Sequence, residues 1–325
     1  MTTALIVPPN AQELATGFLA APGAWRRAAE FFTAEIRNPN TRRAYLNAAR
    51  RFASWARARG LDLARVETVH VAAYIEGLGQ DGADCEKKLT VPSIKQHLAG
   101  LRHLFDHLVS GGVLKINPAA AVRGPRYSAR EGKTPILTGD EPRRLLGAIG
   151  TDSLIGLRDR ALIGAMLYTT ARVSAVLNLN VEDYYPQGST WFLRLHEKGG
   201  KQHIVPCNHH LQEYLDAYIA AAGIARERKA PLFRSIPRGS DAVTKAKLTQ
   251  SNVYELIGRR ASAAGIASQI GCHSMRGTAI TNLLENGSSV EEAQSLANHA
   301  SIRTTKLYDR RDQKVRRDLV ERIRF

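Results

Sequence analysis

The chain has 325 residues, 44% of them hydrophobic, which is enough for two domains with a core in each. Its formal net charge of +16 indicates a polyanionic partner such as nucleic acid. No uninterrupted apolar run approaches the roughly 20 residues of a membrane-spanning helix, which argues against a membrane protein. The N-terminal stretch has no basic leader before its apolar residues, so we expect no secretory signal and a cytoplasmic, nucleoid-associated location.

The cysteines indicate a reducing compartment. Cys85, Cys207 and Cys272 form neither a disulfide framework nor a paired zinc-binding spacing. A zinc site remains conceivable from two of these cysteines and three histidines, namely Cys207, His209, His210, Cys272 and His273. Ordinary buried thiols and polar histidines are the commoner reading, so we expect no metal.

The first part of the chain predicts a loose arm and then a helical bundle. Residues 1–24 are rich in Ala, Pro and Gly without periodicity, which is typical of a flexible arm. Residues 25–122 show helical spacing of apolar residues and predict a compact bundle of about four helices. Its stretch "NPNTRRAYLNAARRFASWARARG" is expected to begin with a cap at Asn40 or Thr41. Its many arginines and lack of acids favour phosphate contact.

The second part predicts a mixed domain. Residues 123–135 break the periodicity with prolines, glycines and basic residues, and predict a linker that follows a nucleic-acid backbone. Residues 136–325 read as a mainly helical domain, ending in a tail, with a small antiparallel sheet. The sheet is predicted from "STWFLRLHEKGGKQHIVPC", an alternating hairpin with a turn at Gly199–Gly200.

Four places in residues 136–325 carry chemistry, although each has a structural alternative. Arg172 interrupts an apolar stretch and could form a salt bridge with Asp152, Asp159 or Glu182. Lys198 lies at the hairpin tip, where a lysine is commonly just solvated. In "HSMRG", an imidazole and a guanidinium three residues apart share a helix face and either converge on one anion or are merely a capping or surface pair. In "HASIRTTKLYDR", a tyrosine on a predicted helix is either core or, beside several basic residues, reactive.

Taken together, the order and spacing of these residues resemble the tyrosine recombinase family, also called the phage integrase family. The resemblance rests on six positions, Arg172, Lys198, His273, Arg276, His299 and Tyr308. It extends to "NTRRAYLNAARRFASWA", which looks like the opening of that family's core-binding domain, and to "GGKQHIVP" after the lysine. It covers roughly residues 30 to 320. The resemblance therefore implies an N-terminal helical core-binding domain and a C-terminal mixed α/β catalytic domain.

The chain departs from the family pattern near two of these residues. Ala171 stands where a glycine often precedes the first arginine, and Ala175 stands where a glutamate often follows it. We expect another acid, Glu182 or Asp183, to orient Arg172. Asn298 replaces the glycine before the last histidine, a mild change because asparagine tolerates left-handed backbone.

The resemblance also implies a mechanism. Tyr308 would attack a DNA phosphodiester, with both arginines stabilising the transition state and Lys198 protonating the leaving oxygen. His273 would accept the tyrosine proton or hold the phosphate, and His299 would bind a phosphate oxygen. No cofactor is expected, since the covalent link conserves the bond energy.

The expected partner is duplex DNA carrying recombination sites. The resemblance implies a homo-tetramer on DNA, from monomers in free solution, with accessory DNA-bending or directionality proteins as possible partners. The C-terminal tail is either a helix packed on its own domain or, as the resemblance implies and as we favour, a segment that docks into a neighbouring protomer. The expected DNA contacts come from the basic helices, the linker and the hairpin: Arg42, Arg43, Arg50, Arg51, Lys95, Arg123, Arg126, Arg130, Lys133 and Lys201.

Two other functions fit part of the pattern. A type IB topoisomerase would share the nucleophile and relax DNA without exchanging strands, but a separate helical first domain, a single short hairpin and the overall length favour a recombinase. A DNA-binding regulator of the same fold would explain Ala175, but not the six reactive positions.

Overall fold

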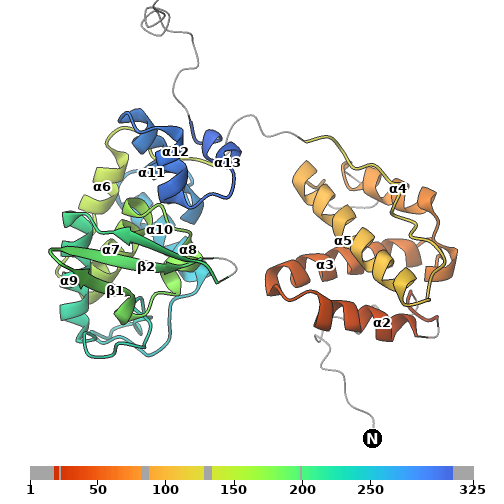
Figure 1. Ribbon diagram of the computed structural model, residues 1–325, viewed down its shortest axis with the longest axis horizontal. Coiled ribbons are helices and arrows are strands. Elements are labelled where there is room, and N and C mark those ends of the chain that lie inside the picture. The colour runs from red at the N-terminus through yellow and green to blue at the C-terminus, as the bar shows by residue number, and fades with distance from the viewer. Residues whose placement is uncertain (1–17, 22, 82–87, 128–133, 198–199, 310–325) are drawn as a thin grey trace, which may run out of the picture. The chain divides into compact units, whose positions relative to one another are not determined.

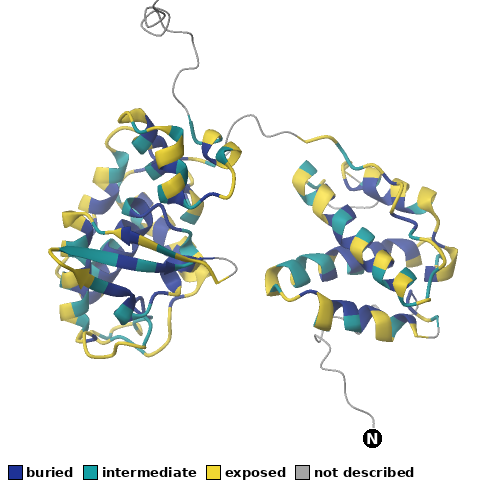
Figure 2. Cartoon of the chain, viewed as in Figure 1, coloured by how far each residue is buried: buried dark blue, intermediate teal, exposed yellow. Residues whose placement is uncertain are grey.

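The chain forms two compact units, Met1–Ser128 and Ala129–Phe325. The computed structural model describes residues 18–21, 23–81, 88–127, 134–197 and 200–309. Each unit buries a hydrophobic core of its own, seen as dark blue in Figure 2. No helix in the described ranges is long and apolar enough to cross a membrane.

Unit 1 is the predicted helical bundle (Figure 1). Its helices are α2 (Ala24–Glu30), which continues into the π-helical turn η2 (Phe31–Glu35), α3 (Pro39–Arg57), α4 (Thr68–Gly77) and α5 (Val91–Ser110), with the short η3 (Leu63–Arg65) between α3 and α4. The apolar stripe of α5 is buried, including Leu101, Phe105 and Leu108. Phe52 of α3 packs edge-on against Phe105, with ring centroids 5.9 Å apart.

The start of α3 differs from the prediction. Its cap is Asn38 rather than Asn40 or Thr41, and the Asn38 side chain accepts hydrogen bonds from the backbone N–H groups of both. The helix then opens with Pro39, which has no N–H that would need a partner at this position.

The expected flexible arm does not reach residue 24. Phe18 and Leu19 are each only 2% exposed, and the Phe18 ring packs edge-on against Phe52 at 5.7 Å. The Leu63 N–H also donates to the Phe18 carbonyl oxygen at 3.1 Å. These residues therefore belong to the core of unit 1, and residues 1–17 lie outside the described part of the chain.

Unit 2 is mainly helical around one small sheet, as predicted (Figure 1). Its helices are α6 (Glu141–Gly147), α7 (Leu154–Tyr168), α8 (Val173–Leu177), η4 (Val181–Asp183), α9 (His209–Ala222), α10 (Gln250–Ala263), α11 (Cys272–Glu285), α12 (Val290–Ala297) and α13 (Ile302–Lys306). α7 is buried on nearly every side, including Leu162 and Met166 at 0% exposure, so it forms the centre of this core.

The sheet has three antiparallel strands in the order β1–β2–β3: β1 (Tyr184–Gln187), β2 (Thr190–His196) and β3 (Gln202–Pro206). The predicted hairpin corresponds to β2 and β3, and its Leu193 and Leu195 are fully buried. Sequence reasoning missed β1. The sequence signal for β1 was Gly188, a residue typical of tight hairpin turns. In the structure it has φ +62° and opens the two-residue turn between β1 and β2.

Candidate active site

Arg172 lies at the N-cap of α8, where its side chain meets the end of the sheet. Its Nη1 lies 2.6 Å from Oε2 of Glu197, which follows β2 directly. The Glu197 side chain is 4% exposed, and the Arg172 side chain is 36% exposed. The expected orienting acids have other partners. Asp183 faces Arg194 and His196, and Glu182 faces Arg228, so the prediction that either orients Arg172 is wrong.

Arg276 lies in the first turns of α11 and is 2% exposed. Its Nη1 donates to the Thr170 carbonyl at 2.5 Å, and its Nη2 donates to the Ala297 carbonyl. Burial and then the charge of Arg172 lower the Arg276 pKa to about 10, against the opposing effects of Glu197 and Tyr308. One guanidinium thus joins the segment before Arg172 to the segment before His299.

Both segments that Arg276 joins contain left-handed backbone. Thr170 has φ +53° and is buried, and Asn298 has φ +47°. Asn298 therefore takes the conformation that was expected of it. A threonine in this region is uncommon and costs on the order of 1 kcal/mol or more, which the surrounding hydrogen bonds of Thr170 offset. Its Oγ1 donates to the Leu296 carbonyl at 3.1 Å.

His299 follows directly and is 7% exposed. Its Nδ1 lies 2.9 Å from the hydroxyl of Thr305, which is fully buried in α13. Burial, and then the charges of Arg276 and Arg172, lower the pKa of His299 to about 4. The imidazole is therefore neutral at pH 7.

Tyr308 lies two residues after the end of α13. The prediction that a helix carries this tyrosine is therefore wrong. Its ring stacks on His299, with centroids 6.0 Å apart and an interplanar angle of 11°. The buried Thr281 of α11 donates to the Tyr308 carbonyl at 2.9 Å. A Cβ at Gly277 would lie 3.1 Å from Tyr308 Cε1, so the ring contacts the α11 backbone closely. Tyr308 is half-buried, and this packing places it in the same cluster as His299 and Arg276.

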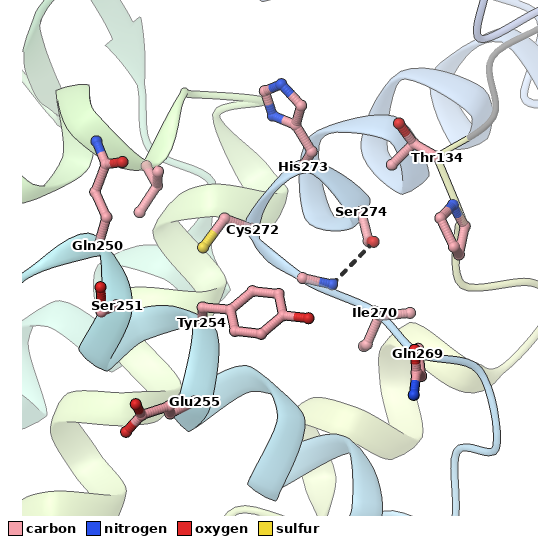
Figure 3. A pocket seen from close by; sticks show the side chains of 13 residues that line it. Thr134, Gln250, Ser251, Tyr254, Glu255, Gln269, Ile270, Cys272, His273 and Ser274 are labelled. Carbon is pink, nitrogen blue, oxygen red and sulfur yellow. Dashed lines mark hydrogen bonds between the residues drawn. The ribbon is translucent and has the colours of Figure 1, made fainter. Parts of the chain in front are cut away.

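His273 stands at the start of α11 on the wall of an open groove of about 770 Å³ (Figure 3). Its side chain reaches solvent, but partial desolvation and then the charges of Arg276 and Arg172 hold its pKa below the ordinary value. Figure 3 also shows Tyr254 of α10 among the side chains that line this groove, and a Cβ at Gly271 would lie only 2.8 Å from its Cε2. The Gly271 N–H donates to Oγ of Ser274 at 3.0 Å, which closes the first turn of α11.

The structure brings together five of the six predicted residues, Arg172, His273, Arg276, His299 and Tyr308, through these contacts and charges. Lys198 lies outside the described residues, between Glu197 and Gly200. The Glu197 N–H donates to the Lys201 carbonyl at 2.8 Å, so β2 and β3 are still paired where the turn begins.

The expected DNA-contact residues fall into three groups. Arg43, Lys95, Arg123, Arg126 and Lys201 are exposed, Arg42, Arg50 and Arg51 are half-buried, and Arg130 and Lys133 lie outside the described residues. Arg42 already has a structural role, because its guanidinium donates to the carbonyl groups of Ile36 and Thr33. The C-terminal tail from residue 310 also lies outside the described part.

Sequence reasoning missed several residues that shape the site, namely Thr170, Glu197, Gly277, Thr281 and Thr305. Glu197 had a usable signal, an acid at the end of a strand predicted to be apolar and alternating. The three hydroxyl groups and the glycine had none. Thr170, Thr281 and Gly277 act through distant segments, and Thr305 acts on His299, six residues before it, across a bend that only the fold sets.

The conceivable zinc site finds no support. Among the described residues, no group of three or more His, Cys, Asp or Glu side chains could hold a metal ion. Burial, and then the charge of Asp216, raise the pKa of Cys207 to about 12, so its thiol stays protonated.

Comparisons with known proteins identify the family. Residues 135–314 match the model of the phage integrase family, and residues 31–112 match the phage integrase N-terminal SAM-like domain. The chain is 30% identical to tyrosine recombinase XerD from Mycobacterium leprae (strain TN) over 275 residues, covering 83% of this chain and 86% of that protein.

Two solved structures share the fold. One is the XerH site-specific recombinase bound to difH substrate in a pre-cleavage complex, with a TM-score of 0.63, 18% identity and coverage of 91% of this chain and 93% of that chain. The other is a lambda integrase tetramer bound to a Holliday junction, with a TM-score of 0.64, 18% identity and coverage of 96% and 84%. The chain therefore belongs to the phage integrase family of site-specific tyrosine recombinases, enzymes that break and rejoin DNA.

Proposed function

We propose that this chain cuts and rejoins duplex DNA through a 3′-phosphotyrosyl intermediate on Tyr308. The phenol oxygen attacks phosphorus, and the 5′-oxygen leaves as a hydroxyl; a 5′-hydroxyl from another strand then attacks the link, reseals the DNA and frees the tyrosine. The observation that carries this proposal is the position of Tyr308, stacked on His299 and hydrogen-bonded through its carbonyl to the helix that bears Arg276.

The two arginines stabilise the charge that develops on the non-bridging phosphate oxygens. Arg276 is held rigidly by two carbonyl groups, and Arg172 is held by Glu197 with part of its guanidinium exposed. Preorganised donors of this kind are worth about 10²- to 10³-fold in rate each.

The two histidines take different roles. His273 reaches solvent and has a lowered pKa, so it is neutral at pH 7 and can accept the proton of the Tyr308 phenol. His299 is buried and neutral, with Nδ1 close to the Thr305 hydroxyl. When Thr305 donates to Nδ1, the His299 proton sits on Nε2, from which it can donate to a phosphate oxygen.

Lys198 is the proposed general acid for the leaving 5′-oxygen. This assignment rests on its position in the sequence, between two paired strands. Its neighbour in the sequence, Glu197, pairs with Arg172, which supports this assignment.

The DNA partner engages both units. The exposed Arg43, Lys95, Arg123, Arg126 and Lys201 are the best-supported contacts with the DNA backbone. Within the described part of the chain, none of their side chains is seen in a hydrogen bond that holds the fold, as the Arg42 guanidinium is. We further propose a tetramer on two DNA sites, supported by the fold shared with the lambda integrase tetramer on a Holliday junction, with the C-terminal tail docking between protomers.

The test is covalent trapping on nicked DNA. Because the target site is not known, a library of nicked duplexes with a randomised core is incubated with the enzyme, and protein–DNA adducts are isolated and sequenced. The wild-type chain should form adducts on a defined sequence, and Tyr308→Phe should form none. Adducts in both would refute Tyr308 as the nucleophile.

Plasmid relaxation and gel-shift assays, run beside the trapping assay, separate the alternative functions. A topoisomerase would relax supercoiled plasmid without a specific site and without joining strands from two duplexes. A binding-only regulator would retain DNA in a gel-shift assay but give no adduct with the wild-type chain.

A further inference from the structure

The helix that Arg172 caps, α8, supplies no acid to orient it. The sequence of α8 is Val-Ser-Ala-Val-Leu, and Ala175, one turn after Arg172, is 1% exposed with only a methyl group to offer. Ala175 is the third residue of the helix, the position from which an acidic side chain can reach back to the N-cap residue, so this place near Arg172 holds no charge. Arg172 instead takes its carboxylate from Glu197, 25 residues later.

Glu197 is held firmly from its backbone outward. Its N–H donates to the Lys201 carbonyl at 2.8 Å, and the preceding His196 pairs with Gln202 in the sheet. Leu195, two residues before, is fully buried in the core of unit 2. A carboxylate anchored in this way and 4% exposed has little freedom to follow a moving partner, so it defines where Arg172 points.

The Arg172–Glu197 pair differs from the structural ion pairs of the same unit. Asp159 is fully buried and accepts hydrogen bonds from both Arg158 and Arg260, which ties α7 to α10. In contrast, Arg172 is 36% exposed and has one hydrogen bond from its side chain among the described residues. One edge of its guanidinium is held, and the remaining N–H groups are left for a ligand.

We infer that Glu197 is the positioning residue for Arg172, a role that rests on the proposed function of Arg172 at the scissile phosphate. The carboxylate fixes the guanidinium through a charge-assisted hydrogen bond before DNA binds. It also offsets the repulsion between Arg172 and Arg276, whose charges act on the same two histidines. The orienting acid is thus supplied by the sheet rather than by α8.

Substitutions of Glu197 should slow DNA cleavage without weakening DNA binding. Glu197→Gln keeps the size and an acceptor but removes the charge, and should slow single-turnover cleavage of the nicked site by about 10-fold. Glu197→Ala removes the orientation as well and should slow it by about 100-fold, the cost of a misplaced reacting group. Binding of the same duplex should stay equal or become tighter, since either change adds one unit of positive charge beside the phosphate.

Two controls separate positioning from general stability. Glu182→Gln alters an acid in a more exposed pair, 3.9 Å from Arg228, and should leave cleavage unchanged. In an Arg172→Lys background, Glu197→Gln should cause little further loss, because Glu197 acts through the guanidinium that is no longer present.

The outcomes are distinguishable. Unchanged cleavage in Glu197→Gln, or an equal loss in the wild-type and Arg172→Lys backgrounds, would overturn the positioning role, as would a fall in DNA affinity and melting temperature that accounts for the whole loss of rate. Failure of the wild-type chain to form a Tyr308-dependent adduct would instead refute the proposed function itself.

Discussion

Adding a methyl group at Gly277 should displace the proposed nucleophile. A Cβ there would lie 3.1 Å from Tyr308 Cε1 and 3.0 Å from Ile136 Cγ2. Carbon atoms pack at about 3.5–4.0 Å, so the Tyr308 ring has to retreat by roughly 0.5–1 Å. Because a misplacement of about 1 Å costs on the order of 10²-fold in rate, Gly277→Ala should slow adduct formation by about 10- to 100-fold.

The effect on stability should be much smaller, because two terms oppose each other. Alanine is favoured over glycine inside a helix by about 1 kcal/mol, whereas overpacking costs about 1–3 kcal/mol. Gly258, in α10, is the matched control, since a Cβ there would meet nothing within 4 Å. Gly258→Ala should therefore gain about 1 kcal/mol, which for a unit of this size raises the melting temperature by roughly 2–4 °C.

The assay compares single-turnover adduct formation on the nicked site, DNA affinity by gel shift and melting temperature for the two variants. Gly277→Ala should lose cleavage while keeping its DNA affinity, and Gly258→Ala should keep both. A Gly277→Ala enzyme that cleaves within twofold of wild type would show that the close contact with α11 does not position Tyr308.

Three further outcomes follow from the same geometry. Arg172→Ala leaves the buried Glu197 carboxylate without its cation, which should cost about 2–3 kcal/mol and lower the melting temperature by roughly 5–10 °C. The double variant Arg172→Ala/Glu197→Ala should recover the melting temperature but form no adduct. An Arg172→Ala chain that melts like wild type would contradict this. His97 and His299 both have a folded-state pKa of about 4, below their unfolded value. The unfolded chain therefore binds more protons, and stability should fall as the pH drops from about 6.5 to 4. Denaturant unfolding at pH 7 and pH 5 should show on the order of 1–2 kcal/mol lost per histidine, and a smaller loss in His299→Gln. A plot of log Kobs for DNA against log salt should be steep, and Arg123→Ala should reduce its slope by about 1; a shallow slope would argue against backbone contact.

Local patterns in the sequence were enough for much of the fold. Apolar spacing predicted the helical bundle of residues 25–122, and alternation with a glycine turn predicted β2 and β3. These predictions succeeded because helix and strand periodicity depend on neighbours within a few residues. β1 was missed because it is only four residues long and contains Pro186, which a strand pattern disfavours.

The chemical residue types were legible for a similar reason. Their order, from Arg172 to Tyr308, matched a family pattern, so the class of reaction could be stated before any geometry was known. The partner of Arg172 could not be predicted in this way. Glu182 and Asp183 are nearer in sequence, yet Glu197 holds the guanidinium, because the three strands bring the end of β2 back to the start of α8.

The amino-acid sequence by itself therefore determined the two-part helical architecture, the basic character and the set of reactive side chains. Tertiary structure alone decided how those side chains are held: by the Thr170 and Ala297 carbonyls on Arg276, by Glu197 on Arg172, and by Gly277 against the ring of Tyr308. Each of these contacts joins segments at least 20 residues apart. Their energies depend on distances that only the folded chain sets, and no local pattern of residues encodes them.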